Sequence, residues 1–192
     1  YLMSGPLMKG EDANFSEKTV AEIANKIIGR LGNVLSFYEL YRDTTLEQKA
    51  FSNPTNVLDI WIMSRLNQLV SEVTEGMEAY DMAEATRPFD LFVDDLSTWY
   101  LRRSRDRMKD NEAEAKQTLY TVLKTIATVL APFAPFTAED MWIRLKNESD
   151  VESVHLSNWP TEVGILSEDV LEYMKVTRNI CAAGHMLRQK SN

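Results

Sequence analysis

Five cationic side chains lie within eight residues of this sequence, in the segment RRSRDRMK at positions 102–109, with one acid among them. Arginine and lysine at this density are typical of a surface that contacts the phosphates of a nucleic acid. A second cationic segment, residues 175–192, contains no acid and holds Lys175, Arg178, Arg188 and Lys190. Each segment has a net charge of +4, whereas the whole chain has −8, so the other 166 residues carry −16. The sequence therefore places two basic islands on an acidic body.

Residues that commonly serve in catalysis or metal binding are sparse. The chain has two histidines, His155 and His185, and one cysteine, Cys181. Cys181 and His185 would share a helix face, but two ligands do not make a zinc site. There is no glycine-rich phosphate loop and no GxSxG or HExxH motif. We therefore predict no catalytic residue, no metal and no cofactor in this chain. The single cysteine fits a reducing, cytoplasmic location.

Helices must position the basic islands, because helical spacing dominates the sequence. Apolar residues recur every three or four positions in six stretches. We expect helices at about 16–41, 58–80, 82–109, 112–130, 137–146 and 168–189. No stretch alternates between apolar and polar residues long enough to indicate a strand, and no apolar run reaches the ~18 residues of a membrane span. The predicted fold is all-α, an up-and-down bundle of long helices with a short irregular segment before the last one.

Single residues mark the expected ends and irregularities of these helices. Ser16 and Thr137 are expected to cap the N-termini of the first and fifth helices. Pro88 should either kink the third helix or mark its true start. Gly29 and Gly32 lie inside the first helix, where the close approach of a neighbouring helix would explain them.

The connecting segments carry turn-forming residues. Ser52–Asn56 contains a proline and two asparagines and is expected to be a loop. The two prolines of APFAPF at 131–136 should end the fourth helix. In the irregular stretch before the last helix, Val154–Leu156 is compatible with a short extended piece.

The helix over 89–109 combines a core-facing stripe with the first basic island. At 100° per residue, Phe89, Phe92, Trp99 and Tyr100 fall on one side with Leu96. Arg103 and Arg107 continue this stripe, so we expect their stems to pack on the core and their guanidinium groups to pair with acids or carbonyls. The opposite side is either a solvated helix face or a phosphate-contacting strip, and it consists of Arg102, Arg105 and Lys109.

The segment DDLSTWYLRRSRDR at 94–107 resembles the signature helix in the anticodon-binding domain of isoleucyl-tRNA synthetases. Further matches follow in the same order along nearly the whole chain. They are YLMSGPLMKGEDANFSEKTV (1–20), DIWIMSRLN (59–67), TLYTVLKTIATVLAPFAPFTAEDMW (118–142) and ESVHLSNWP (152–160). The first of these resembles the stretch that follows the family's KMSKS loop. Basic WYLRRSRDR, in place of WYxE, favours the isoleucine enzyme over its valine relative.

The resemblance implies that the chain is part of a larger ligase, which joins isoleucine to its tRNA with ATP and Mg²⁺. Residues 1–15 would then be the linker from a missing catalytic domain, 16–167 the anticodon-binding bundle, and 168–192 a truncated C-terminal helix. The implied partners are the anticodon stem-loop of isoleucine tRNA and the catalytic domain of the same polypeptide, with no membrane and a monomeric fragment. The candidate tRNA-binding residues are Trp99, Arg102, Arg103, Arg105, Arg107, Lys109, Arg178, Arg188 and Lys190.

Two alternatives remain open at this point. The chain could be the anticodon-binding domain of a valine or leucine synthetase. It could instead be a non-catalytic helical scaffold that binds protein, which the acidic body and the nine methionines would suit. The scaffold hypothesis gains if Arg102, Arg105 and Lys109 prove to be scattered or buried in ion pairs.

Overall fold

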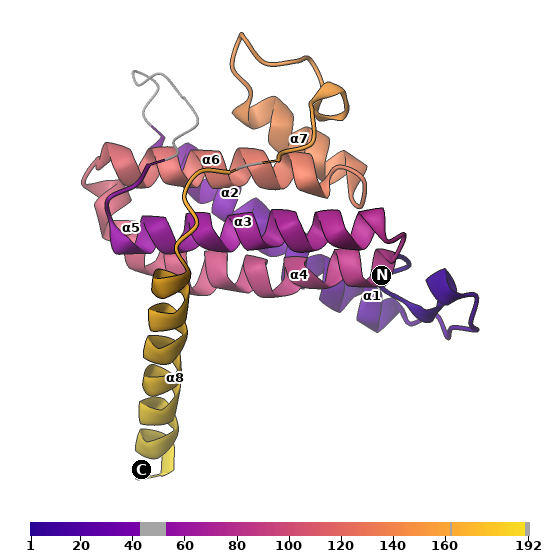
Figure 1. Ribbon diagram of the computed structural model, residues 1–192, viewed down its shortest axis with the longest axis horizontal. Helices are drawn as coiled ribbons and strands as arrows, with labels where there is room; N and C mark the ends of the chain where they lie inside the picture. The colour runs from indigo at the N-terminus through magenta and orange to yellow at the C-terminus, as the bar shows by residue number, and fades with distance from the viewer. Residues whose placement is uncertain (43–52, 162, 191–192) are drawn as a thin grey trace.

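The computed structural model describes residues 1–42, 53–161 and 163–190, and these form an all-α bundle (Figure 1). Eight α-helices follow one another: α1 Glu17–Ile23, α2 Arg30–Tyr41, α3 Val57–Glu78, α4 Met82–Asp94, α5 Leu101–Lys109, α6 Ala113–Leu130, α7 Pro135–Leu145 and α8 Glu168–Lys190. Short 3-10 turns are η1 Pro6–Lys9 and η4 Val154–Leu156. Within these ranges there is no strand, and the predicted all-α bundle is confirmed.

Two of the predicted helices are single rods that each contain one wider turn. The π-helical turn η2, Ala24–Gly29, joins α1 to α2, and a second π-turn, η3, Asp95–Tyr100, joins α4 to α5. The Ser16 side chain accepts a hydrogen bond from the Thr19 amide at 3.3 Å, so the predicted N-cap is confirmed. A π-turn holds one more residue than an α-turn, which matters below for the basic island of α5.

The core lies where α2, α3, the α4–η3–α5 rod and α6 face one another. Ile62, Leu66, Leu96, Leu123 and Ile126 are among its fully buried members. Helices α3 and α4 are in close contact at Gly76. A Cβ atom there would lie 2.6 Å from the Ala85 backbone nitrogen, so only glycine fits.

The structure excludes one of the two possibilities for Pro88, and the expectation for the glycines of the first helix was wrong. Helix α4 begins at Met82, where Asp81 caps it at 3.0 Å from the Glu84 amide, so Pro88 lies inside the helix and does not mark its start. Among the described residues, a Cβ built at Gly32 meets nothing within 4 Å, and one built at Gly29 meets only Ala24 and Asn25 of the adjoining π-turn. The close approach of two helices that we expected at these glycines occurs between α3 and α4 instead.

Two further differences concern the segments around α7. This helix begins at Pro135 after Ala134, so Thr137 lies in its first turn and is not its cap. A proline at the first position suits a helix start, because its missing N–H would be unpaired there anyway. The stretch Val154–Leu156 is the 3-10 turn η4, not an extended piece, because the Ser157 amide donates to the Val154 carbonyl at 3.1 Å and closes the turn. The Glu139 carboxylate of α7 accepts from the Val154 amide at 2.9 Å. The loop before α3 is confirmed from Asn53 onward, and Ser52 lies outside the described residues.

Helix α8 leaves the bundle crosswise and carries the C-terminal end of the described chain away from it (Figure 1). Met174 is its one buried residue. The predicted last helix is confirmed, but most of its apolar side chains do not face the bundle. Tyr173, Val176, Ile180 and Leu187 are all exposed.

Candidate nucleic-acid interface

The π-turn η3 changes which residues of α5 face the core. An extra residue in one turn rotates everything that follows by about 100° relative to a regular helix. Ser104 and Met108 are buried as a result, whereas the regular spacing predicted that Arg103 and Arg107 would continue the apolar stripe. The prediction of a core-packed stem was wrong for Arg103, which is exposed, and only partly right for Arg107, which lies at the edge of the buried face. The expected carbonyl partner of Arg103 is present, because its guanidinium donates to the Trp99 carbonyl at 3.5 Å.

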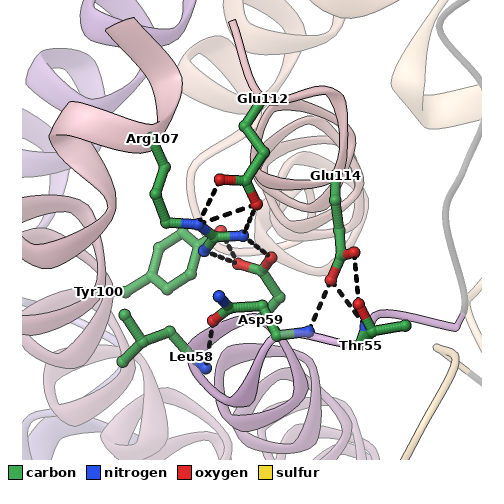
Figure 2. Close-up of polar contacts among 8 residues, drawn as sticks. Thr55, Leu58, Asp59, Tyr100, Arg107, Glu112 and Glu114 are labelled. Carbon is green, nitrogen blue, oxygen red and sulfur yellow. Dashed lines mark hydrogen bonds and ion pairs between the residues drawn. The ribbon is translucent and has the colours of Figure 1, made fainter. Parts of the chain in front are cut away.

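Arg107 joins three segments of the bundle through one buried and one partly exposed ion pair (Figure 2). Its guanidinium donates to both oxygens of Asp59 on α3, at 3.0 and 2.6 Å, and to the Glu112 carboxylate in front of α6. Asp59 has no exposed surface, and the Tyr100 hydroxyl donates to it at 2.7 Å. The predicted pairing of Arg107 with acids is therefore confirmed, and its role in the fold is to fix α5 against α3 and α6.

The ion pairs and hydrogen bonds of this network keep Arg107 charged and Tyr100 protonated. Burial alone would lower the pKa of Arg107, but hydrogen bonds and charges from Asp59 and Glu112 outweigh burial and raise that pKa above its ordinary value. Burial, with the Asp59 charge, raises the pKa of the Tyr100 hydroxyl well above its ordinary value. Tyr100 thus stays protonated as a donor and Arg107 stays cationic, so Asp59 keeps its partners.

The end of α5 is fixed by its backbone as well. Asn111 has a positive φ of 63°, and the amide of Glu112 donates to the Arg107 carbonyl at 3.0 Å. This is the αL ending in which a carbonyl left unpaired by the helix finds a donor beyond it. Nearby, the Glu114 carboxylate accepts from the amides of Thr55 and Asn56 at 2.7 and 2.8 Å, and so ties the loop before α3 to α6 (Figure 2).

Three cations of the first island are exposed on this fixed helix. Arg102 and Arg105 have no acidic partner among the residues that the structure describes, and the Arg105 guanidinium lies 5.6 Å from the centre of the Phe37 ring on α2. Lys109 makes one loose pair with Asp106, at 3.7 Å, in which the Asp106 side chain is 89% exposed. These three side chains lie on the solvent side of α5, as the sequence predicted.

Arg103 and Trp99 form a stack at the start of α5. The Arg103 guanidinium carbon lies 3.2 Å from the centre of the indole ring, and the indole N–H donates to the Met174 sulfur of α8 at 3.2 Å. Burial lowers the pKa of Arg103, and the charges of Arg102 and Arg178 lower it further. One face of the Trp99 ring is therefore covered by a cation, which fits its predicted role in packing better than base stacking.

Arg178 is the main polar anchor of α8. It pairs with Asp95 of η3, which also accepts from Arg65 of α3 at 2.8 Å. Asp95 is buried, and the adjacent Asp94 is in an ion pair of its own, since it accepts from Arg30 at 2.7 Å. Arg188 and Lys190 lie near the far end of α8, exposed and away from these contacts.

Sequence reasoning missed the residues that hold the basic strip in place. Asp59, Tyr100 and Glu112 were not among the candidates, although Asp59 interrupts an apolar stretch at the start of α3. A charged residue on the buried side of a predicted helix was the one available signal, because such a charge needs a partner. Across the described ranges, no three side chains of His, Cys, Asp or Glu are placed to hold a metal ion, and none of the helices is apolar and long enough to cross a membrane.

Comparisons with known proteins agree with this architecture. Residues 59–192 match the family described as the anticodon-binding domain of tRNA ligase. The chain is 39% identical to an isoleucine–tRNA ligase of Chlamydia trachomatis serovar A over 198 residues, 99% of this chain and 19% of that protein. Isoleucine–tRNA ligases of Chlamydia muridarum and Clostridium novyi are 40% and 38% identical over 99% and 100% of this chain. The chain thus spans about a fifth of the length of these relatives.

A solved structure shares the fold. The chain resembles the crystal structure of the ternary complex of Agrobacterium radiobacter K84 agnB2 LeuRS–tRNA–LeuAMS, with a TM-score of 0.55 and 16% sequence identity over 83% of this chain and 18% of that one. At this identity the likeness concerns the fold alone. The family match covers well over half of the sequence and includes both basic islands. By this match, the chain belongs to the anticodon-binding domain family of tRNA ligases.

Proposed function

We propose that the chain is the RNA-binding module of an isoleucine–tRNA ligase and holds the anticodon stem-loop of isoleucine tRNA. Aminoacylation, with ATP and Mg²⁺, is then carried out by a catalytic domain of the same cytoplasmic polypeptide. The observation that carries the proposal is that Arg102 and Arg105 are exposed, with no acidic partner among the described residues, on a helix that the buried Arg107–Asp59 pair holds in place. The identity to isoleucine–tRNA ligases supports the choice of amino acid.

The proposed role of the module is to position the tRNA. Arg102, Arg105 and Lys109 contact phosphates of the RNA backbone, and such contacts fix register and orientation without reading sequence. Arg103 adds a charge at the start of the same helix, while Trp99, Arg107 and Arg178 hold the helices that present these cations. Arg188 and Lys190 form a second, outlying contact. With one end of the tRNA fixed, its acceptor end is placed for the catalytic domain.

The acidic part of the chain disfavours other orientations of the RNA. Residues outside the two basic islands carry a net charge of −16 and repel phosphate wherever RNA approaches in another orientation. Acidic side chains also pair with the cations that lie elsewhere on the bundle, such as Lys26 with Asp90 at 2.6 Å. Among the described residues, most of the exposed cations without an acidic partner therefore lie on α5 and at the end of α8, with Arg42 and Lys146 as exceptions.

A salt titration tests the proposal. The chain should bind the anticodon stem-loop of isoleucine tRNA with an affinity that falls as salt rises, since each phosphate contact releases counterions. The double charge reversal Arg102→Glu with Arg105→Glu should weaken binding at least about 10-fold. Reversal of Lys18, an exposed cation of α1 far along the chain from α5, is the matched control and should change binding little. No binding at low salt, or equal loss in both variants, would refute the proposal.

One observation favours a protein partner for part of the surface. On α8, Val176, Ile180 and Leu187 are exposed on the side away from the bundle. A contiguous apolar face of this kind is typical of a helix covered by other protein.

Two further parts of the proposal have their own tests. Sedimentation checks the monomeric state that we propose for the chain, and competition between isoleucine, valine and leucine tRNAs tests the choice of ligase.

A further inference from the structure

Helix α8 carries a regular repeat on its outer side, away from the bundle. Seven positions follow one another at alternating intervals of four and three residues, which is the spacing of the seam in a two-helix coiled coil. We call these positions the outer seam, and they are Asp169, Tyr173, Val176, Ile180, Ala183, Leu187 and Lys190. At 100° per residue they fall within a sector of about 100°. Met174, which is buried against the bundle, lies about 150° from the middle of that sector.

Every side chain of the outer seam is exposed. The exposed fractions of Tyr173, Ile180 and Leu187 are 70%, 67% and 67%, and that of Val176 is 46%. Exposed apolar side chains in a continuous row are typical of a surface that other protein covers. Because α8 projects from the bundle, a second helix can lie along this row without meeting the bundle of the same chain (Figure 1). The outer seam is therefore accessible for pairing between helices.

The two ends of the outer seam have opposite charges. Asp169 lies in the first turn of α8 and Lys190 in the last, and the five seam residues between them are uncharged. If two copies of α8 run antiparallel about Ile180, each of these carboxylates faces an ammonium group of the other copy. The layers of such a pair are Asp169 with Lys190, Tyr173 with Leu187, Val176 with Ala183, and Ile180 with itself. In a parallel pair, like charges would face each other at both ends and repel. The outer seam is thus complementary to itself in the antiparallel orientation.

We infer that the outer seam of α8 is the contact surface for a second copy of this chain, in an antiparallel pair centred on Ile180. Such a contact is isologous, because the same surface of each copy meets the other across a two-fold axis. The bundle of each copy lies beside the start of its own α8, so the antiparallel pair places the two bundles at opposite ends (Figure 1). The inference goes beyond the proposed function and does not depend on RNA binding.

The length of the outer seam determines how strongly two copies pair. Its apolar part, from Tyr173 to Leu187, extends over about 21 Å of the helix axis. Interfaces below about 1,200 Å² of total buried area are weak and transient, and a single short helix contact belongs to this class. We therefore expect a monomer in dilute solution, as proposed above, and pairing at high concentration. Lys190 cannot contact Asp169 and an RNA phosphate at the same time, so pairing is measured without RNA.

Sedimentation equilibrium of the 192-residue chain, from about 10 µM to about 1 mM, measures pairing. The average mass should rise from that of one copy towards that of two. Ile180→Asp places two carboxylates against each other at the centre and should weaken pairing at least about 100-fold. The matched control, Ala182→Asp, adds the same charge at an exposed position on another side of α8 and should change pairing little. Circular dichroism confirms that each variant keeps its helices.

A charge exchange tests the orientation of the two helices. Asp169→Lys and Lys190→Asp each place like charges opposite one another and should weaken pairing about 5-fold. The double variant restores opposite charges and should return to within about 2-fold of the unchanged chain, because the two changes act on one contact. A parallel pair has like charges in contact before and after every exchange, so equal pairing of all three variants would overturn the antiparallel arrangement.

Disulfide cross-linking tests the register after Cys181→Ser has removed the native thiol. Oxidation should link a mixture of the Tyr173→Cys and Leu187→Cys variants, and neither variant should link to itself. A chain that remains monomeric at about 1 mM overturns the inference, and the outer seam is then covered by another protein or by another part of the polypeptide. Equal weakening by Ile180→Asp and Ala182→Asp also overturns it. RNA binding by a chain that does not pair leaves the proposed function intact.

Discussion

The two basic islands, on α5 and on the later part of α8, each have a net charge of +4, but the bundle holds the two helices in different ways. Helix α5 buries Ser104 and Met108 and is joined to α3 and α6 through Arg107. Helix α8 has one buried residue, Met174, and its principal ion pair is the one between Arg178 and Asp95. The cations of α5 therefore have fixed positions, whereas those at the end of α8 lie on a projecting helix.

The comparison shows that two segments of equal net charge have different roles. On α5, one arginine of the island is used as an anchor, and the others are presented at defined points. On α8, the anchor Arg178 lies ten residues before Arg188, about 15 Å along the axis. A charge that is already in place loses less conformational entropy when a phosphate binds. We therefore expect α5 to dominate RNA affinity and α8 to add to it.

Loss of the α5 anchor should have the largest effect. Arg107→Ala leaves Asp59 buried without its cation, and breaking a buried pair in this way costs about 3–5 kcal/mol. Urea unfolding followed by circular dichroism measures the free energy of unfolding. The matched control Arg105→Ala removes an exposed arginine two residues away and should change it by less than about 0.5 kcal/mol. A loss below about 1 kcal/mol for Arg107→Ala would mean that α5 is not anchored as described.

Loss of the α8 anchor should be smaller and local. Asp95→Ala removes the carboxylate that accepts from both Arg65 and Arg178. Because these two arginines are 21% and 30% exposed and can bind water instead, we expect the free energy of unfolding to fall by about 1–3 kcal/mol. Amide hydrogen exchange should show lost protection in the first turns of α8 and retained protection in α6. Equal loss in both helices would contradict the distinction between a fixed and a projecting helix.

The sequence predicted the helices well because their apolar spacing is regular, and it predicted the wrong face for Arg103 because the spacing is not regular everywhere. No residue type in Asp95–Tyr100 predicts a π-turn, yet that turn determines which cations of α5 are exposed. The anchor of α5 was missed for a related reason. Asp59 and Arg107 are 48 residues apart, and their pairing follows from the packing of two helices, which local spacing does not encode.

RNA affinity gives a direct comparison of the two helices. Arg102→Ala with Arg105→Ala should weaken binding of the anticodon stem-loop about 10-fold and reduce the slope of log affinity against log salt by about 2, one for each lost phosphate contact. Arg188→Ala with Lys190→Ala removes the same number of charges from α8. We expect a smaller loss, with a slope reduced by less than about 1. If the α8 pair has the larger effect, the projecting helix is the principal contact and the ranking is reversed.

The smallest effect concerns pH and the carboxylates that fix α5 and the start of α6. Burial would raise the pKa of Glu114, but hydrogen bonds from the amides and hydroxyl of Thr55 and Asn56 outweigh burial and lower it below its ordinary 4.5. A carboxylate whose pKa is lower in the folded state contributes stability above its unfolded pKa, and this contribution is lost as pH falls through the folded value. Glu114→Gln should therefore reduce the loss of unfolding free energy between pH 6 and about 3.5 by less than about 1 kcal/mol, because the carboxylate is only partly buried.

The matched control for this pH dependence is Glu148→Gln, at an exposed glutamate with no hydrogen-bond partner in the described part of the chain. That variant should keep the wild-type pH dependence of the free energy of unfolding. If Glu114→Gln also keeps it, the loop before α3 is held by packing alone and the carboxylate is incidental. If Glu114→Gln flattens the dependence, the hydrogen bonds from Thr55 and Asn56 hold α3 against α6.

The position of α5 depends on both of these helices, because Arg107 pairs with Asp59 of α3 and with Glu112 before α6. Acid should then loosen the support of α5 before it unfolds the core.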